Sequence, residues 1–143
     1  MLVAIIVIID QLIKYFIYMN KPQIPVIPGV INITYAQNTG TLFGLAQGSN
    51  TFFIISSIII IAFIVIITMK MKKYSSRRKV WKLILGGGIS NLIDRIFRGF
   101  VIDYVELKIF GVCNLADFCI VIGVIGFIIV ELKEIFSENK EPI

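Results

Sequence analysis

Residues 52–69, FFIISSIIIIAFIVIITM, form a run of eighteen residues without a charge. A helix needs about this length to cross a hydrocarbon core ~30 Å thick at 1.5 Å per residue. The whole chain of 143 residues is 57% hydrophobic and only 16% charged, and its mean hydropathy is +0.91. These values lie far outside the range of soluble domains. The sequence therefore predicts a single integral membrane domain built around this segment.

Three further segments have the length and apolar character of a span: 2–19, 80–97 and 114–132. The first is interrupted by Asp10, Gln11 and Lys14, and it lacks the basic start and the small-residue cleavage site of a signal peptide. The third contains glycines at 86–88, which permit close approach between membrane helices. We predict an all-α membrane protein with four transmembrane helices.

The basic residues indicate how the chain is oriented. Seven of the fourteen Lys and Arg residues fall in 70–82, a segment without any acid. A short basic loop between two spans is typical of the cytoplasmic side, so the net charge of +5 does not indicate a nucleic-acid partner. Alternation then places both termini in the cytoplasm, and it places residues 20–50 and 98–113 outside.

The outer segment 20–50 carries a strand pattern. Ile31, Ile33 and Tyr35 alternate with Asn32 and Thr34, which is the period of two expected of a half-buried strand. We therefore expect an outer β region at about 24–50, lying on the membrane surface.

Composition narrows the chemistry that the chain can perform. It has no histidine, and its two cysteines are Cys113 and Cys119, which excludes zinc sites made of His and Cys and triads that use imidazole. Ser90 and Lys82 are eight positions apart on one helix, or about 12 Å, too far for a Ser/Lys dyad. Carboxylates remain as the reactive groups, and we expect no metal and no cofactor.

Three aspartates from separate segments are expected at one depth. Asp94 lies fourteen positions after Val80, or roughly 21 Å along the helix, near the outer boundary. Asp117 lies in the first turn of the last helix, and Asp103 lies in the short connection before it. Charged groups at membrane depth are costly unless they are paired or functional, so this convergence predicts a functional site.

The spacing of the polar residues suggests which of them form structural pairs and which form an orienting network. Asp10 and Lys14 stand at i and i+4, which favours a structural ion pair. Asn91, Asp94 and Arg95 share a face of the third span, which favours an orienting network around Asp94.

Asp103 and Asp117 have no cation beside them in the sequence. Two such carboxylates at the edge of an apolar phase have their proton affinities driven apart, so that one holds a proton while the other is ionised. An aspartic protease needs this division of roles.

Two other classes of protein remain as alternatives. A small transporter or proton relay also uses intramembrane carboxylates, but it favours groups spread through the membrane depth, whereas three of the four aspartates are expected at the outer edge. A membrane scaffold without catalysis would have no use for the convergent polar set.

Five segments of the sequence resemble, in order, the signature blocks of one family, the bacterial prolipoprotein (type II) signal peptidases. The segments are DQLIK (10–14), NTGTLFG (38–44), GGGISNLIDR (86–95), GFVIDY (99–104) and NLADF (114–118). The resemblance implies an aspartic endopeptidase of the bacterial cytoplasmic membrane, with four helices, an outer β-cradle and its active site at the outer face. Such an enzyme cuts lipidated prolipoproteins before the diacylglyceryl-modified cysteine, and it acts as a monomer without a cofactor.

The resemblance also implies roles for individual residues. Asp103 and Asp117 match the catalytic positions. Positions that hold substrate are matched by Asn38, Asn91, Arg95 and Asn114. An orienting role is implied for Asp10, Lys14, Gly40, Asp94 and Ala116.

The sequence departs from the family pattern at Leu42, Ser90, Tyr104 and Cys113. We expect Leu42 and Ser90 to affect the shape of the substrate groove. The implied partners are the diacylglyceryl-modified prolipoprotein and membrane lipid, with no nucleic acid.

Overall fold

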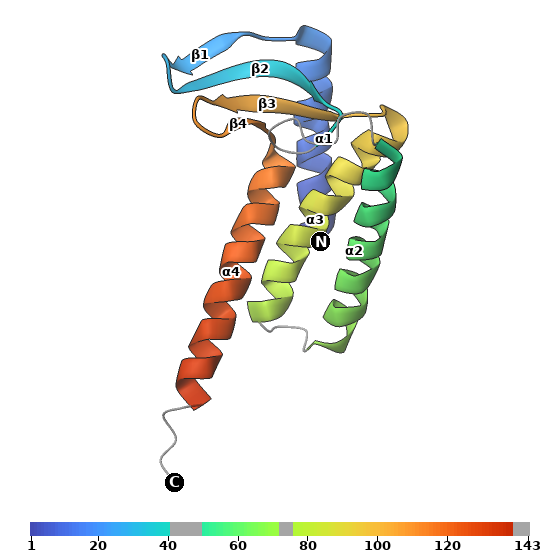
Figure 1. The fold of residues 1–143 in the computed structure, drawn as a ribbon, viewed down its shortest axis with the longest axis vertical. Helices are drawn as coiled ribbons and strands as arrows, with labels where there is room; N and C mark the ends of the chain where they lie inside the picture. The colour runs from blue at the N-terminus through green and yellow to red at the C-terminus, as the bar shows by residue number, and fades with distance from the viewer. Residues whose placement is uncertain (41–49, 72–75, 139–143) are drawn as a thin grey trace.

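The computed structural model describes residues 1–40, 50–71 and 76–138. Within them, four helices alternate in direction and four strands gather at one end of the helices (Figure 1). The helices are α1 (Leu2–Asn20), α2 (Asn50–Lys70), α3 (Ser76–Phe97) and α4 (Leu115–Glu138). The strands are β1 (Ile24–Ile27), β2 (Ile31–Asn38), β3 (Val101–Leu107) and β4 (Gly111–Cys113).

Three of the helices in the described residues are long and apolar enough to cross a membrane, namely α1, α2 and the part of α4 from Leu115 to Phe136. Their outer surfaces expose many large apolar side chains, whereas Asp10, Lys14 and Asp94 are fully buried. This reversal of the soluble pattern is what lipid around the helices favours, since polar groups must then find their partners inside the protein. The predicted membrane character is confirmed.

Helix α3 lies between the other helices and packs most closely against α4. At Gly87 a side-chain methyl group would collide with the carbonyl oxygen of Ala116 on α4. At Gly123 on α4 it would come within 2.5 Å of Ile84 and 3.0 Å of the Val80 carbonyl. These contacts confirm that glycines allow the helix backbones to approach closely.

One predicted boundary needs a correction, and one connection has more structure than was predicted. The basic segment 70–82 is not all loop, because α2 runs to Lys70 and α3 begins at Ser76, so that its second half is helical. The connection 98–113 contains β3 and β4, two strands that were not predicted. Gly111, with φ of 84°, takes up the left-handed conformation that closes the turn between these strands.

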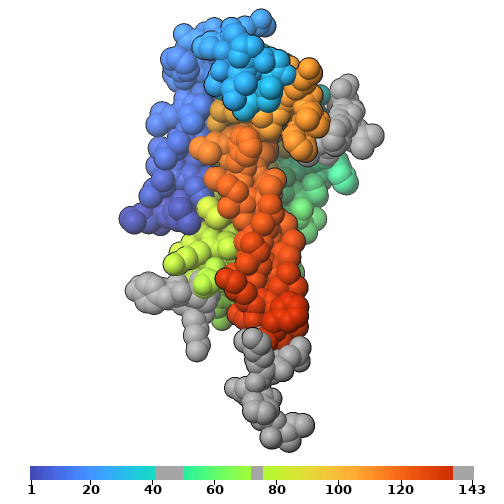
Figure 2. All heavy atoms as spheres, turned by 90° about the vertical axis from the view of Figure 1, so that its left-hand side faces the viewer, coloured from blue at the N-terminus to red at the C-terminus, as the bar shows by residue number. Residues whose placement is uncertain are grey.

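The strands form one antiparallel sheet in the order β1-β2-β3-β4. The outer segment supplies β2, as its alternation predicts, and also β1, which the alternation did not indicate. Residues 41–49 of the predicted β region lie outside the described residues. Strand β3 joins β2 through the register that places Ala36 opposite Asp103. The sheet caps the same end of the helices in both views (Figures 1 and 2).

A small apolar cluster joins the sheet to α1. Ile17 of α1 packs with Ile102 and Tyr104 of β3, and all three are buried. Side chains alternate between the faces of a strand, so Asp103 points to the opposite face of β3 from Ile102 and Tyr104. The cluster therefore holds β3 in place while Asp103 faces the other way.

Candidate active site

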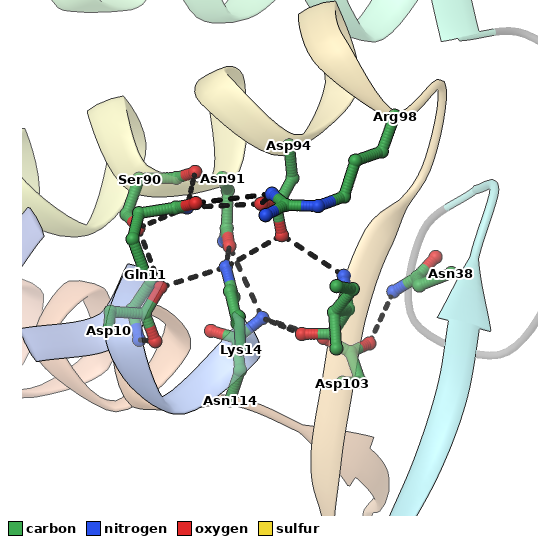
Figure 3. Close-up of polar contacts among 12 residues, drawn as sticks. Asp10, Gln11, Lys14, Asn38, Ser90, Asn91, Asp94, Arg98, Asp103 and Asn114 are labelled. Atoms are coloured by element: carbon green, nitrogen blue, oxygen red, sulfur yellow. Dashed lines mark hydrogen bonds and ion pairs between the residues drawn. The ribbon is translucent and has the colours of Figure 1, made fainter. Parts of the chain in front are cut away.

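Asp103 is buried in β3 and is held by two amides, as Figure 3 shows. Asn38, the last residue of β2, donates from Nδ2 to Asp103 Oδ2 at 2.9 Å. Asn114 donates from Nδ2 to Asp103 Oδ1 at 2.6 Å. Sheet pairing supplies the first amide and the start of α4 supplies the second, so the position of Asp103 depends on both.

Asp117 belongs to a capping box at the start of α4. Asn114 Oδ1 accepts the N–H of Asp117 at 2.9 Å, and Asp117 Oδ2 accepts the N–H of Asn114 at 3.1 Å. This reciprocal arrangement satisfies N–H groups that a helix start leaves without partners. The same bonds that begin the helix thus fix the Asp117 carboxylate, and the helix N-terminus favours a negative charge there.

Two asparagines connect the carboxylates. Asn91 of α3 donates from Nδ2 to Asp117 Oδ1 at 2.8 Å. Asn114 Nδ2 also lies 3.2 Å from Asn91 Oδ1, in addition to its bond with Asp103. Asp103 and Asp117, which the sequence predicts to converge, therefore share one amide network.

The surroundings of Asp103 favour its protonated form. Burial, followed by the negative charge of Asp117, raises the pKa of Asp103 from 3.8 to about 6, against the hydrogen bonds from Asn38 and Asn114 and the charge of Lys14. Asp103 accordingly holds its proton well into the pH range in which an exposed aspartate is ionised.

A second cluster lies beside the carboxylates, with Lys14 at its centre (Figure 3). Lys14 Nζ lies 2.8 Å from Asp10 Oδ2 and 3.0 Å from Asp94 Oδ2, and all three side chains are fully buried. The predicted pair of Asp10 and Lys14 is confirmed. Lys14 Nζ also donates to Asn91 Oδ1 at 2.8 Å, so the ion cluster continues into the amide network.

Asp94 differs from its predicted setting. In the described part of the chain its ion pairs are with Lys14 and Arg98, and none is with Arg95. Arg98 stands at i+4 on the same face of α3, whereas the next residue in a helix points elsewhere. Asp94 Oδ2 also accepts the N–H of Ile102 at 3.1 Å, which joins α3 to β3.

Arg95 points instead toward the segment that leads out of β2. Its Nη2 donates to the carbonyl of Gly40 at 3.0 Å, and its guanidinium lies 4.6 Å from the centre of the Phe53 ring. The N–H of Gly40 in turn donates to Asn38 Oδ1 at 3.0 Å. Arg95 and Gly40 therefore support Asn38, the residue that holds Asp103.

Asp10 also reaches the start of α4. Its Oδ1 accepts the N–H of the fully buried Ala116 at 3.2 Å. The same oxygen also accepts the hydroxyl of Tyr104 at 3.4 Å. The Tyr104 hydroxyl accepts the N–H of Leu115 at 3.0 Å. Asp10 thus helps to place the helix turn that carries Asp117.

Sequence reasoning did not predict the contacts of Ser90, Gln11 and Arg98 in the Lys14 cluster. Ser90 donates to Asp10 Oδ2 at 2.6 Å, and Gln11 donates to Asp94 Oδ1 at 3.0 Å and accepts from Arg98 at 3.1 Å. Ser90 is fully buried among these groups, so its expected effect on a substrate groove is not supported. The position of Gln11 beside Asp10 in an apolar run was the available signal. Leu42 lies outside the described residues.

The charges of the two clusters come close to balance. Among the described residues, the carboxylates of Asp10, Asp94, Asp103 and Asp117 adjoin the cations of Lys14, Arg95 and Arg98. Four negative charges against three positive ones become neutral when one carboxylate is protonated. Buried charge is costly without compensation, which favours a single proton on the pair of Asp103 and Asp117.

Cys113, which lies between Asp103 and Asp117 in the sequence, is a poor nucleophile. Its Sγ donates to the carbonyl of Val105 at 3.5 Å, and burial with the nearby charges of Asp117 and Asp103 raises the pKa of the thiol to about 11. A nucleophilic cysteine needs its thiolate form, so these surroundings disfavour cysteine chemistry.

Comparison with known proteins gives consistent results. A family model described as signal peptidase (SPase) II matches residues 2–133. The lipoprotein signal peptidase of Caldanaerobacter subterraneus subsp. tengcongensis is 34% identical over 135 residues, which cover 90% of this chain and 93% of that protein. The protein of the same name from Halothermothrix orenii is 37% identical over 125 residues, covering 85% and 86%. A bacterial membrane enzyme solved by the in meso method at 2.3 Å superposes with a TM-score of 0.89 at 33% identity, covering 99% of this chain and 92% of that one.

Proposed function

The chain belongs to the signal peptidase II family of aspartic peptidases, and from that premise we propose that Asp103 and Asp117 are its catalytic pair. The observation that carries this proposal is the shared amide network. Asn114 bonds both residues, and within the described residues neither carboxylate forms an ion pair. Asp10 and Asp94, by contrast, are neutralised by Lys14 and Arg98.

The proposed roles follow from the surroundings of the two carboxylates. Asp117 is the ionised base, because it lies at a helix N-terminus, which favours a negative charge, and Asp103, whose burial favours the protonated form, carries the proton. Asp117 takes a proton from water as the water oxygen bonds to the scissile carbonyl carbon. Asp103 gives its proton to the carbonyl oxygen, which produces a neutral tetrahedral diol.

Collapse of the diol returns both groups to their starting states. Asp117 gives its proton to the amide nitrogen, and the bond from carbon to nitrogen breaks. Asp103 recovers a proton from one diol hydroxyl as the carboxylic acid product forms. No covalent intermediate forms, and the sequence of steps requires no cofactor.

The proposed substrate is a lipoprotein precursor, because the relatives are named lipoprotein signal peptidases and a signal peptidase acts on a protein that still carries its signal peptide. Its diacylglyceryl-modified cysteine and apolar signal segment enter from the bilayer, so the bond before that cysteine reaches the sheet end of the helices. Asn38, Asn91, Arg95 and Asn114 hold the peptide, and Gly40 and Ala116 support them through the backbone bonds described above. One copy of the chain suffices.

The proposed topology has four spans in the bacterial cytoplasmic membrane. Helix α3 has 22 residues, enough to cross, and its Asn91 and Asp94 side chains face the interior clusters rather than lipid. The basic end of α2 and α3 lies in the cytoplasm with both termini, and the sheet lies outside.

The test is to replace Asp103 or Asp117 with Asn and to measure cleavage of a lipidated prolipoprotein in proteoliposomes. Loss of one acid–base group is expected to lower the rate by roughly 10²–10⁴-fold. A variant that matches wild-type turnover removes its aspartate from the catalytic pair. Glu131→Gln, at the opposite end of α4 from Asp117, is the control for loss of a carboxylate.

A further inference from the structure

The two hairpin turns of the sheet lie against each other. Lys108, in the turn between β3 and β4, donates its N–H to the carbonyl of Val30, in the turn between β1 and β2, at 3.1 Å. Each turn is closed by its own bond: Val30 N–H to Ile27 O at 2.9 Å, and Phe110 N–H to Leu107 O at 3.0 Å. The turns therefore form one unit, which we call the hairpin tip: Ile27, Val30, Ile109 and Phe110.

The hairpin tip is apolar and faces outward. Ile109 is 83% exposed, Phe110 67%, Val30 53% and Ile27 48%. Turns in soluble proteins favour Gly, Pro, Asn, Asp and Ser, because turns face water. Adjacent exposed Ile and Phe at the end of a hairpin mark a contact surface rather than a solvated turn.

The chain keeps the hairpin tip close to the membrane. Phe110 is followed by β4, which leads into α4 at Leu115, and five residues of extended chain span at most about 17 Å. Figure 1 shows both turns projecting past α4, on the side away from α2. Figure 2 looks at that side and shows them above the beginning of α4. The hairpin tip thus projects beyond the exposed apolar surface of α4.

We propose that the hairpin tip inserts into the boundary between acyl chains and headgroups of the leaflet at the sheet end. Apolar side chains beside a basic group are the composition of interfacial anchors. Lys108 is exposed next to the tip, and its long side chain reaches lipid phosphates. The nearby carboxylate of Glu106 accepts a hydrogen bond from Asn32 Nδ2 at 2.9 Å. The exposed apolar surface of α4 continues from this level through Val121 and Ile122, which identifies lipid as the occupant.

The anchor has a consequence for the site. Ile109 lies six residues beyond Asp103 along β3 and its turn, or about 20 Å when extended. Seating the tip in lipid then sets the height of Asp103 relative to the bilayer. This consequence rests on the proposed function, whereas the insertion itself does not.

The experiment uses a single tryptophan as a depth reporter in the full-length protein. The native tryptophan is removed by Trp81→Phe, and Ile109→Trp is added, with Phe110→Trp as a second reporter. Gln23→Trp, at the exposed start of the sheet away from the turns, is the matched control. Each variant is placed in phosphatidylcholine and phosphatidylglycerol vesicles, and its fluorescence is quenched with iodide from water and with lipids brominated near the headgroup end of the acyl chains.

Insertion predicts that brominated lipids quench the tip reporters several-fold more than the Gln23→Trp reporter, and that iodide shows the reverse order. Iodide quenching of the tip equal to that of the control overturns the proposal. So does a tip shielded from both quenchers, which indicates that protein, such as a second copy, covers it. Equal lipid quenching of tip and control also overturns it, because the whole sheet then lies in lipid. Adding Phe110→Ser to the Ile109→Trp reporter is expected to lower lipid quenching.

Discussion

Lys14 Nζ lies 2.8 Å from Asn91 Oδ1, and Asn91 Nδ2 lies 2.8 Å from Asp117 Oδ1. One asparagine therefore connects a buried lysine to a proposed catalytic carboxylate. The positive charge of Lys14, next to the Asn91 amide oxygen, polarises the amide and strengthens its N–H donors. Lys14 is thus a positioning residue for Asp117, as well as the counter-ion of Asp10 and Asp94.

Lys14→Met is expected to destabilise the protein strongly. Lys14 is fully buried between Asp10 and Asp94, and removing one partner of a buried ion cluster costs about 3–5 kcal/mol. Thermal unfolding in detergent micelles measures the loss. Lys133→Met, an exposed lysine of α4, is the control and is expected to change the unfolding temperature little. Equal behaviour of the two variants would mean that Asp10 and Asp94 find other compensation.

Asp94→Asn is expected to lower the yield of folded protein without abolishing catalysis by the molecules that fold. Asp94 ties Lys14, Arg98 and the N–H of Ile102 together, but it bonds neither Asp103 nor Asp117 in the described residues. Cleavage per folded molecule, counted after size-exclusion chromatography, separates the two effects. A well-folded but inactive variant would assign Asp94 to the chemistry.

Gly87→Ala is expected to reduce both stability and activity, because the added methyl group meets the carbonyl of Ala116 and forces α3 away from α4. That movement separates Asn91 from Asp117, and overpacking of this kind costs about 1–3 kcal/mol. The neighbouring Gly88→Ala is a matched control, since among the described residues its methyl group comes near Ile61 alone, at 3.7 Å. Unfolding temperature and prolipoprotein cleavage are measured for both. Similar losses in the two variants would contradict the packing argument.

Stability is expected to fall as pH rises through about 6, through Asp103. Its pKa is higher in the folded protein than the ordinary 3.8, so the folded state binds the proton more tightly. This contribution to stability is fully present below pH 3.8 and is lost as pH rises through about 6. The difference between the two pKa values corresponds to roughly 3 kcal/mol of unfolding free energy. The measurement compares unfolding of wild type and Asp103→Asn at pH 5 and pH 8. The variant is expected to lose less stability over this interval, and an identical loss would exclude Asp103 as its source.

Much of the site is visible in the sequence because helical spacing is regular. The pairs Asp10 with Lys14 and Asn114 with Asp117 lie one turn apart, so their contacts depend on one helix only. Their apolar surroundings indicate membrane depth, and there an uncompensated carboxylate requires a partner or a function. The motif blocks identify the family for the same reason, since each lies within one short segment.

What the sequence by itself determined is the membrane character, the polar residues at that depth and the pairings within a single helix. Only the tertiary structure decided that residues 101–107 pair with β2, that Lys14 of α1 bonds Asp94 of α3, and that Lys14 reaches Asn91. The pair of Asp94 and Arg98, at i and i+4, follows from helical spacing, but sequence reasoning missed it. The physical reason is that spacing along a helix sets the direction of a side chain. The distance to a group on another element depends on how closely the backbones pack, as Gly87 against Ala116 allows here.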